Sequence, residues 1–143
     1  MPKSTTFSND LAALIFNATA IANLADNASS SPLTSLYISL HTASPGIGGS
    51  QTTNETAYTN YARVAVTRNS GGWTVASGAA SNAALIQFAQ CGASGATITH
   101  VAVGTASSGT GKVLYAGALN SSLAVANLIQ PQFSIGALVC TES

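Results

Sequence analysis

Apolar side chains near the N-terminus recur every three or four residues, which is the spacing of one face of an α-helix. Asp10 would then lie in the first turn, after a cap at Ser8 or Asn9. The polar segment 26–32 closes with a proline, which ends the helix. The pattern therefore predicts a helix over residues 9–25. Its apolar stripe consists of Leu11, Leu14, Ile15, Ala18, Ile21, Ala22 and Ala25.

After residue 32 the apolar period changes from about four residues to two. Leu36, Ile38 and Leu40 alternate with more polar neighbours, as in a half-buried strand. A hairpin signal at 69–72 separates two predicted strands, and a Gly/Ser-rich turn at 107–111 separates two more. The predicted strands are 36–41, 61–67, 73–76, 83–89, 96–103, 112–116, 123–126, 129–133 and 137–141.

Eight or nine short strands without intervening helices are typical of an antiparallel sandwich or barrel, a jelly roll included. We therefore expect a mainly β fold, with one N-terminal helix followed by an antiparallel β-sandwich. The expected domains are an N-terminal arm and helix over 1–32 and a β-sandwich domain over 33–143.

Charged side chains are scarce in this chain. Its 143 residues include four Lys or Arg and four Asp or Glu, 6% in all, where an ordinary soluble domain has about 25%. Surface charge normally keeps a protein soluble and unassociated, so the composition indicates a component of a larger assembly. No basic stripe is present for nucleic acid or anionic lipid, and no apolar stretch is long enough to span a membrane. We expect neither a nucleic-acid nor a membrane partner.

Residues that could support catalysis are few and scattered. His41 and His100 have no serine elbow or carboxylate arranged around them. The Gly-rich segment 104–112 resembles a phosphate-binding loop, but Ala106 and Val113 replace the required glycine and hydroxyl. We expect no catalytic residue, no cofactor and no enzymatic activity.

The two cysteines, Cys91 and Cys140, each lie in or beside an apolar run and have no metal ligand nearby in sequence. We expect buried, reduced thiols and no metal site.

Candidate interface residues come from the helix and from the aromatic side chains. The helical stripe must be covered, either by the rest of the chain or by a neighbour. Tyr58 and Tyr61 flank the mouth of the long Gly/Pro/Ser loop, where they can pack in the core or anchor a partner. The candidate interface residues are Leu11, Leu14, Ile15, Tyr58 and Tyr61.

Several segments together resemble a family of small virion proteins of tailed bacteriophages. The resemblance rests on an LHTASPG turn, a Y-x-x-YAR strand and a late strand ending in a Gly-rich hairpin. In this chain they occur in 36–46, 54–66, 72–75, 97–109 and 114–119. Ser44 departs from the family pattern, in which Asp precedes Pro-Gly.

The resemblance implies a structural protein of the virion, present in the host cytoplasm during assembly, and implies no catalytic residue. We expect a capsid cement or decoration protein that stabilises the assembled head, because the chain has neither heptads nor a fibrous repeat. The alternatives are a tail-fibre or tail-associated subunit and a module that binds host-surface glycans. The expected partners are the major capsid protein or other virion proteins and further copies of the chain, as a trimer or dimer.

Overall fold

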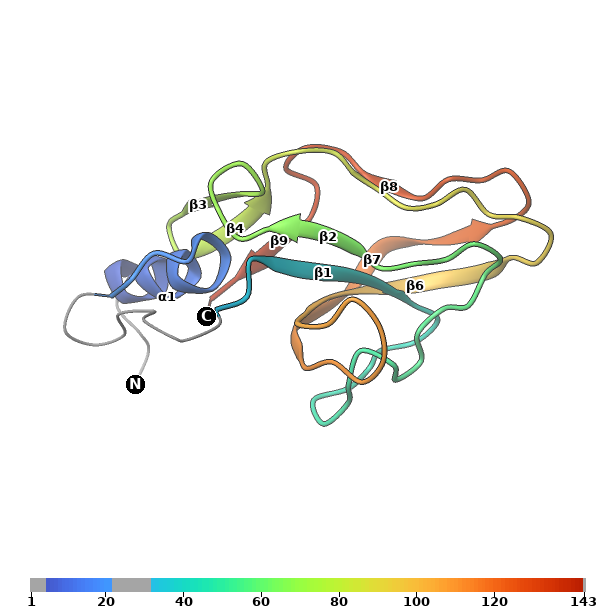
Figure 1. The fold of residues 1–143 in the computed structure, drawn as a ribbon, viewed down its shortest axis with the longest axis horizontal. Helices are drawn as coiled ribbons and strands as arrows, with labels where there is room; N and C mark the ends of the chain where they lie inside the picture. The colour runs from blue at the N-terminus through green and yellow to red at the C-terminus, as the bar shows by residue number, and fades with distance from the viewer. Residues whose placement is uncertain (1–4, 22–31, 143) are drawn as a thin grey trace. The chain divides into compact units, whose positions relative to one another are not determined.

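The computed structural model describes residues 5–21 and 32–142. Within them the chain forms one helix, α1 (Thr5–Asn17), followed by nine strands (Figure 1). The strands are β1 (Ser35–His41), β2 (Val64–Thr67), β3 (Trp73–Ala76), β4 (Ala79–Asn82), β5 (Ile86–Gln87), β6 (Ala96–Gly104), β7 (Val113–Val125), β8 (Gln132–Phe133) and β9 (Val139–Thr141). The expected class, mainly β after one N-terminal helix, is confirmed.

The strands form a four-stranded sheet in the order β2-β1-β6-β7, a three-stranded sheet β3-β4-β9 and the pair β5-β8. β1 pairs antiparallel with β6, and β6 pairs antiparallel with β7. The pairings of β3 with β4 and of β4 with β9 are antiparallel as well.

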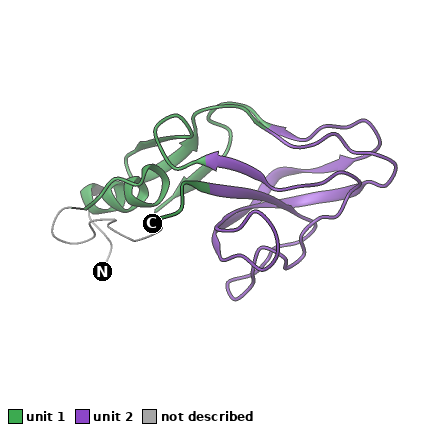
Figure 2. Ribbon diagram, viewed as in Figure 1, with its two compact units in different colours: residues 1–35, 67–86, 133–143 green, residues 36–66, 87–132 purple. Residues whose placement is uncertain are grey.

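By its internal contacts the chain divides into two compact units (Figure 2). Unit 1 comprises residues 1–35, 67–86 and 133–143, and it contains α1 and the β3-β4-β9 sheet. Unit 2 comprises residues 36–66 and 87–132, and it contains nearly all of the four-stranded sheet. Each unit is thus built from segments far apart in sequence, and the predicted boundary at residue 32 falls inside unit 1.

Helix α1 differs from its predicted bounds at both ends. It begins at Thr5, so Asp10 lies beyond the first turn, and it ends at Asn17, because Ala18 takes a left-handed conformation with φ +53°. Arg68 satisfies two of the last carbonyls: Nη2 donates to Leu14 O at 2.7 Å and Nε to Ile15 O at 2.6 Å. The predicted continuation to Ala22 and Ala25 lies outside the described residues.

The buried face of α1 is also not the predicted stripe. Ser8, Ala12 and Phe16, each four residues apart, are buried, whereas Leu11, Leu14 and Ile15 are half-buried. Phe16 packs edge-on against Trp73, with ring centroids 4.6 Å apart. A Cβ on Gly78 would lie 2.8 Å from the Cβ of Ser8, so small residues let the helix approach this turn closely.

The hairpin predicted at 69–72 is wrong, although the turn itself forms. The carbonyl of Asn69 accepts from the N–H groups of Gly72 and Trp73, each at 3.0 Å. However, β2 pairs with β1 and β3 pairs with β4, and Trp73 at the start of β3 is fully buried in unit 1. The hairpin that does form turns at Ser77 (φ +52°) and Gly78 (φ +74°), a pair suited to a two-residue loop.

The apolar positions predicted in β1 are buried in the core of unit 2, but the strand is not half-buried as predicted, because Ser39 and His41 on its other face are buried as well. Leu36, Ile38 and Leu40 are at most 2% exposed, and Ile38 and Leu40 lie opposite Val103 and Val101 of β6. Other predicted bounds change. β2 is shorter than predicted, segment 83–89 keeps only Ile86–Gln87, segment 129–133 keeps only Gln132–Phe133, and 112–116 and 123–126 belong to one irregular strand, β7.

Candidate functional site

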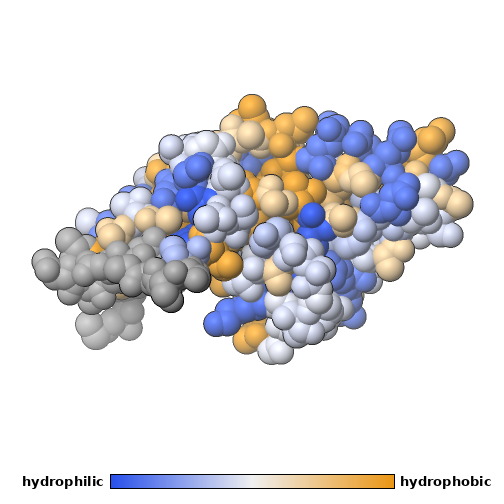
Figure 3. Space-filling model, in the orientation of Figure 1, coloured by the Kyte–Doolittle hydropathy of each residue, from blue (hydrophilic) through white to orange (hydrophobic). Residues whose placement is uncertain are grey.

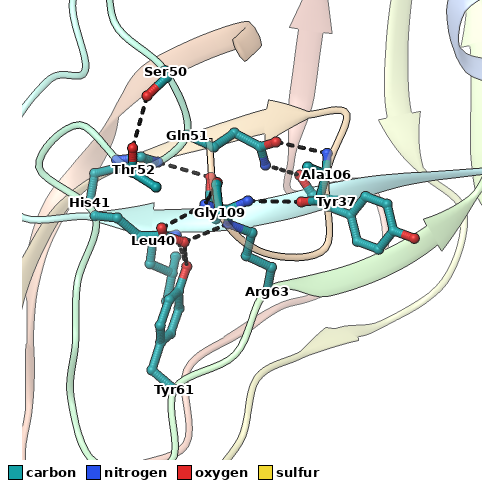
Figure 4. Close-up of polar contacts among 12 residues, drawn as sticks. Tyr37, Leu40, His41, Ser50, Gln51, Thr52, Tyr61, Arg63, Ala106 and Gly109 are labelled. Atoms are coloured by element: carbon teal, nitrogen blue, oxygen red, sulfur yellow. Dashed lines mark hydrogen bonds and ion pairs between the residues drawn. The ribbon is translucent and has the colours of Figure 1, made fainter. Parts of the chain in front are cut away.

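A cluster of polar side chains in unit 2 joins two loops to the sheet (Figure 4). The long loop covers residues 42–56, between β1 and the segment that leads to β2. The hairpin loop covers residues 105–112, between β6 and β7. Loops held on a rigid scaffold commonly carry binding or catalytic residues, so this cluster is the place to look for a functional site.

Arg63 is the centre of the cluster. Its Nε and Nη2 donate to the two carboxylate oxygens of Glu55, each at 2.7 Å. Nη1 donates to Ala106 O at 2.9 Å and Nη2 to Gly109 O at 2.8 Å. The Arg63 side chain is 3% exposed and that of Glu55 15%. The hydrogen bonds to Glu55 raise the pKa of Arg63. Because Arg63 binds Glu55 of the long loop and two carbonyls of the hairpin loop at once, it ties the two loops together.

Gln51 makes a second link between the same loops. Its backbone N–H donates to Gly111 O at 2.9 Å, and its Oε1 accepts from Ala106 N–H at 2.9 Å. The side chain is fully buried. A Cβ on Gly104 would lie 2.1 Å from the Gln51 side chain, and one on Gly111 2.0 Å. These positions therefore need glycine to leave room for the amide.

His41 forms a buried pair with Ser39, two residues before it on β1. His41 Nδ1 lies 2.9 Å from Thr53 O, and Nε2 lies 2.9 Å from Ser39 Oγ. A carbonyl only accepts, so Nδ1 carries the proton and Nε2 accepts from the serine hydroxyl. Burial, the largest cause, lowers the pKa of His41, which favours this neutral form.

The Ser39–His41 contact resembles the nucleophile–base pair of a hydrolase, a juxtaposition that sequence reasoning missed. Two features distinguish it from a working pair. Both side chains are fully buried, and the orienting group is a backbone carbonyl rather than a carboxylate. Glu55 is the bridge partner of His41, but its carboxylate is bound by Arg63 and Tyr61. The pair has no surface on which to receive a substrate.

The two tyrosines that the sequence suggested as interface residues, Tyr58 and Tyr61, differ in their surroundings. Tyr58 is 2% exposed, its hydroxyl donates to Ala89 O at 2.9 Å, and burial raises its pKa to about 12. Tyr58 therefore belongs to the core. Tyr61 is half-buried; its hydroxyl donates to Glu55 and accepts from Leu40 N–H at 3.0 Å. Burial first, and then the Glu55 charge, raise the pKa of Tyr61.

The other residues singled out from the sequence do not take part in the polar cluster. His100 is half-buried, with Nδ1 2.8 Å from Thr99 Oγ1. Cys91 and Cys140 are buried free thiols, as predicted, and burial raises the pKa of Cys140 to about 12. Leu11, Leu14 and Ile15 belong to unit 1 and the tyrosines to unit 2.

In residues 5–21 and 32–142, no three His, Cys, Asp or Glu side chains come together as ion ligands. No helix in the same part of the chain has the length and apolar character to cross a bilayer.

A shallow hollow lies beside the cluster, between the tip of the long loop and the start of β7. Its volume is about 350 Å³, and Ser44, Gly46, Ile47, Val113, Leu114 and Ala116 line it. None of these residues is charged. Ile47 is fully exposed at its rim, with a relative exposure of 110%.

The arrangement of unit 2 is thus two firmly held loops beside an uncharged hollow, with the side chains of His41, Glu55, Tyr61 and Arg63 bonded internally. A family model described as "Podophage GP4 fiber I protein gp80" matches residues 3–141. The chain belongs to this family. The match covers nearly the whole chain and confirms the resemblance to phage virion structural proteins. A comparison with curated proteins found no match.

The motif residues that this chain shares with the expected family pattern have structural positions in unit 2. The Y-x-x-YAR motif supplies Tyr58, Tyr61 and Arg63, and the LHTASPG motif supplies His41 and the start of the long loop. In the structure these residues pack and pin loops. The motif residues are therefore explained by the architecture of unit 2.

Proposed function

We propose that this chain is a non-enzymatic structural subunit of a podophage virion fibre. The observation that carries the proposal is the family match over residues 3–141, because the matching family is described as a fibre protein. The buried cluster supports the proposal that the subunit is not an enzyme. The polar groups of Ser39 and His41 and those of Glu55 and Arg63 form hydrogen bonds with one another and with the loops.

The chain would act through its surface, by binding other virion proteins and further copies of itself. A charge-poor surface suits such a role, because little charge must be desolvated on association. The rigid loops of unit 2 would add specificity, since pre-organised loops lose little conformational entropy when they bind.

Capsid cement is the second candidate. Its support is compositional: the chain is poor in charge and has no heptads or fibrous repeat. The family description favours the fibre. We do not propose the host-glycan alternative, because Tyr58 is buried and the ring of Tyr61 packs against Tyr58 and Phe88, which leaves these two rings unsuited to stacking on a sugar.

The test is to assemble phage particles without this chain and to add the purified chain back. A fibre subunit predicts complete heads with missing or incomplete fibres, and restored fibres after addition. Intact fibres on heads that have lost heat resistance would instead support cement. The variant Ser39→Ala is expected to restore fibres as well as the wild type; failure of this variant, when folded, would contradict the non-enzymatic role.

A further inference from the structure

Strand β7 lies at one edge of the four-stranded sheet, beside β6 (Figure 1). Among the described residues, no strand pairs with its other edge. The backbone N–H and C=O groups of such an edge can bind a further strand, and proteins commonly protect long edges with charged residues or proline. β7 has 13 residues and contains neither a charged residue nor a proline. The edge is therefore open to the addition of a strand.

The long loop already uses the beginning of this edge. Ser50 pairs antiparallel with Lys112, the residue before β7. Thr105 N–H, just after β6, donates to Lys112 O at 3.1 Å, whereas Gln51 N–H donates to Gly111 O at 2.9 Å. Because successive carbonyls of a strand point to opposite edges, the loop binds the edge that β6 leaves open. The pairing does not extend beyond this bridge.

The hollow described above lies next to this bridge, along β7. Val113, Leu114 and Ala116 of β7 form one wall, and the tip of the long loop forms the other. Figure 3 shows the surface over the two loops in largely pale colours, because Ser, Thr, Gly and Ala make up most of both loops. Neither charge nor hydrophobicity therefore selects an occupant. The unpaired edge does, because it binds an extended segment through backbone hydrogen bonds.

A large bulge in β7 restricts which segment can be added. Between the pairs His100–Ala118 and Ile98–Leu123, one residue of β6 stands opposite four residues of β7, 119–122. The extra residues cannot join the ladder, so they protrude from it, and residues 120–122 are exposed. A strand can pair along this edge only if it leaves space opposite the bulge.

The hollow and the bulge lie on either side of Gly117, at matching distances in sequence. The wall of the hollow comes from residues 113–116, and the bulge follows at residues 119–122. When two copies of β7 pair antiparallel about Gly117, the bulge of each copy therefore faces the hollow of the other. The same register places Tyr115 opposite Leu119, an aromatic–aliphatic cross-strand pair of the kind that stabilises sheets. A second copy of β7 thus supplies both the extended segment and the space.

Gly117 has no evident role within its own chain. A Cβ added there would meet no atom within 4 Å, and its φ lies outside the left-handed region. A glycine inside a strand weakens the strand and often marks a place where another backbone approaches closely. Its neighbours, Ala116 and Ala118, are small and exposed, and they would face each other across the axis of the pair. The centre of the proposed contact is therefore free of obstruction.

We infer that two copies of this chain pair through their β7 edges, antiparallel and centred on Gly117, with residues 119–122 of each copy in the hollow of the other. The contact uses the same surface on both copies, so it is isologous and closes as a dimer. The two four-stranded sheets then form one continuous sheet. The inference deepens the proposed fibre function and rests on it for its biological setting.

Charge at the axis tests the pairing. Gly117→Lys and Gly117→Glu each place like charges opposite each other, which opposes strand pairing. Analytical ultracentrifugation of the purified full chain should show dimers for the wild type and a dissociation constant at least about tenfold higher for each variant. The unfolding midpoints of both variants should change little, because the added side chains enter open space. The matched control Ser108→Lys, in the exposed hairpin loop, should dimerise as the wild type does.

An equimolar mixture of Gly117→Lys and Gly117→Glu gives the decisive result. Opposite charges face each other only in the antiparallel pair centred on this residue, so the mixture should recover dimers that neither variant forms alone.

Oxidative cross-linking checks the same register without added charge. Directly opposite residues have Cα atoms about 4.5–5.5 Å apart, a separation that a disulfide can bridge. Gly117→Cys should therefore form a covalent dimer on mild oxidation, and Ser108→Cys should not.

Three results would overturn the inference: a wild type that stays monomeric up to about 0.1 mM, dimers that Gly117→Lys leaves unchanged, or a mixture that stays monomeric. If the charged variants fail to fold, the absence of cross-linking in Gly117→Cys overturns it instead.

The inference and the proposed function fail separately. Gly117→Lys protein that dimerises like the wild type and restores fibres would remove the inference and leave the fibre role. Dimers paired through β7, formed by a chain that is absent from the fibre, would do the reverse.

Discussion

At the scale of single residues, Arg63 joins parts of unit 2 that lie far apart in sequence. Its guanidinium binds a carboxylate eight residues away and carbonyls 43 and 46 residues away. A buried ion pair contributes little net stability relative to an apolar pair, but removing one partner leaves an unpaired buried charge. Arg63 therefore keeps the two loops in one arrangement.

Replacing Arg63 with Met should destabilise the chain by about 3–5 kcal/mol, since the largely buried Glu55 carboxylate loses its partner. The measurement is the free energy of unfolding in urea. The matched control is the double variant Glu55→Gln/Arg63→Met, in which no charge is left unpaired and which should be less destabilised. A double variant as unstable as the sum of its two single variants would show that the pair is not coupled.

The buried histidine predicts a pH dependence of stability. Burial lowers the folded-state pKa of His41 below its ordinary value of 6.5, so below pH 6.5 the unfolded chain binds more protons than the folded chain. Stability from this group is complete above pH 6.5 and falls as the pH decreases toward the folded pKa, by at most about 1.4 kcal/mol per pH unit.

The check is to measure unfolding free energy between pH 7.5 and pH 5 for the wild type and for His41→Gln. The variant should be less stable at pH 7.5 and should lose part of the pH dependence. Equal slopes for the two proteins would contradict a neutral buried His41.

Sequence reasoning drew attention to some residues of this cluster but not to Ser39 or Gln51, and not to the contacts among them. The Y-x-x-YAR and LHTASPG motifs contain His41, Tyr58, Tyr61 and Arg63. Gln51 lies in a stretch without periodicity, and its contact with Ala106 spans 55 residues. Only the topology, which places the loops at the same end of neighbouring strands β1 and β6, brings these groups together.

At the scale of elements, helix α1 shows why a periodic pattern can indicate the correct structure and the wrong face. Large apolar residues define the stripe Leu11, Leu14 and Ile15, but the face that packs is Ser8, Ala12 and Phe16. Close approach to β3 and β4 requires small side chains beside one large ring. Hydrophobicity alone does not report that requirement.

The two faces of α1 should respond differently to a charge. Ala12 is 1% exposed and Leu14 is half-buried. Ala12→Asp is therefore expected to cost several kcal/mol, through overpacking and an unpaired buried carboxylate, and Leu14→Asp distinctly less. Thermal unfolding followed by circular dichroism measures both. A larger loss for Leu14→Asp would mean that the predicted stripe is the face that packs.

For the strands too, the sequence pattern indicated the elements better than it indicated their packing partners. Alternation and β-branched residues predicted β1 and β6 closely, because both lie inside a sheet and bury several apolar side chains. Pairing was harder to predict. The Asn69 turn has the composition of a hairpin, but β3, which begins at the buried Trp73, pairs with β4 instead of β2.

At the scale of the whole molecule, the scarcity of charge determines how the chain can associate. With eight charged residues, of which Arg63 and Glu55 are engaged internally, contacts with partners must rely on apolar area and neutral hydrogen bonds. Such contacts are only weakly screened by salt.

Self-association and incorporation into particles should therefore change by less than about threefold between roughly 0.05 M and 0.5 M NaCl. Sedimentation at the two salt concentrations measures the first, and add-back to particles lacking the chain measures the second. A steep loss of binding at high salt would show that the few charged residues dominate the interface.

The central claim is that this chain is a structural component of the virion fibre. Electron cryomicroscopy of intact particles tests it most directly, because density for the β2-β1-β6-β7 sheet with its two pinned loops can be located in the particle. The account predicts that density in the fibre, repeated in contacting copies. The same density on the capsid shell, or its absence from the whole particle, would contradict the account.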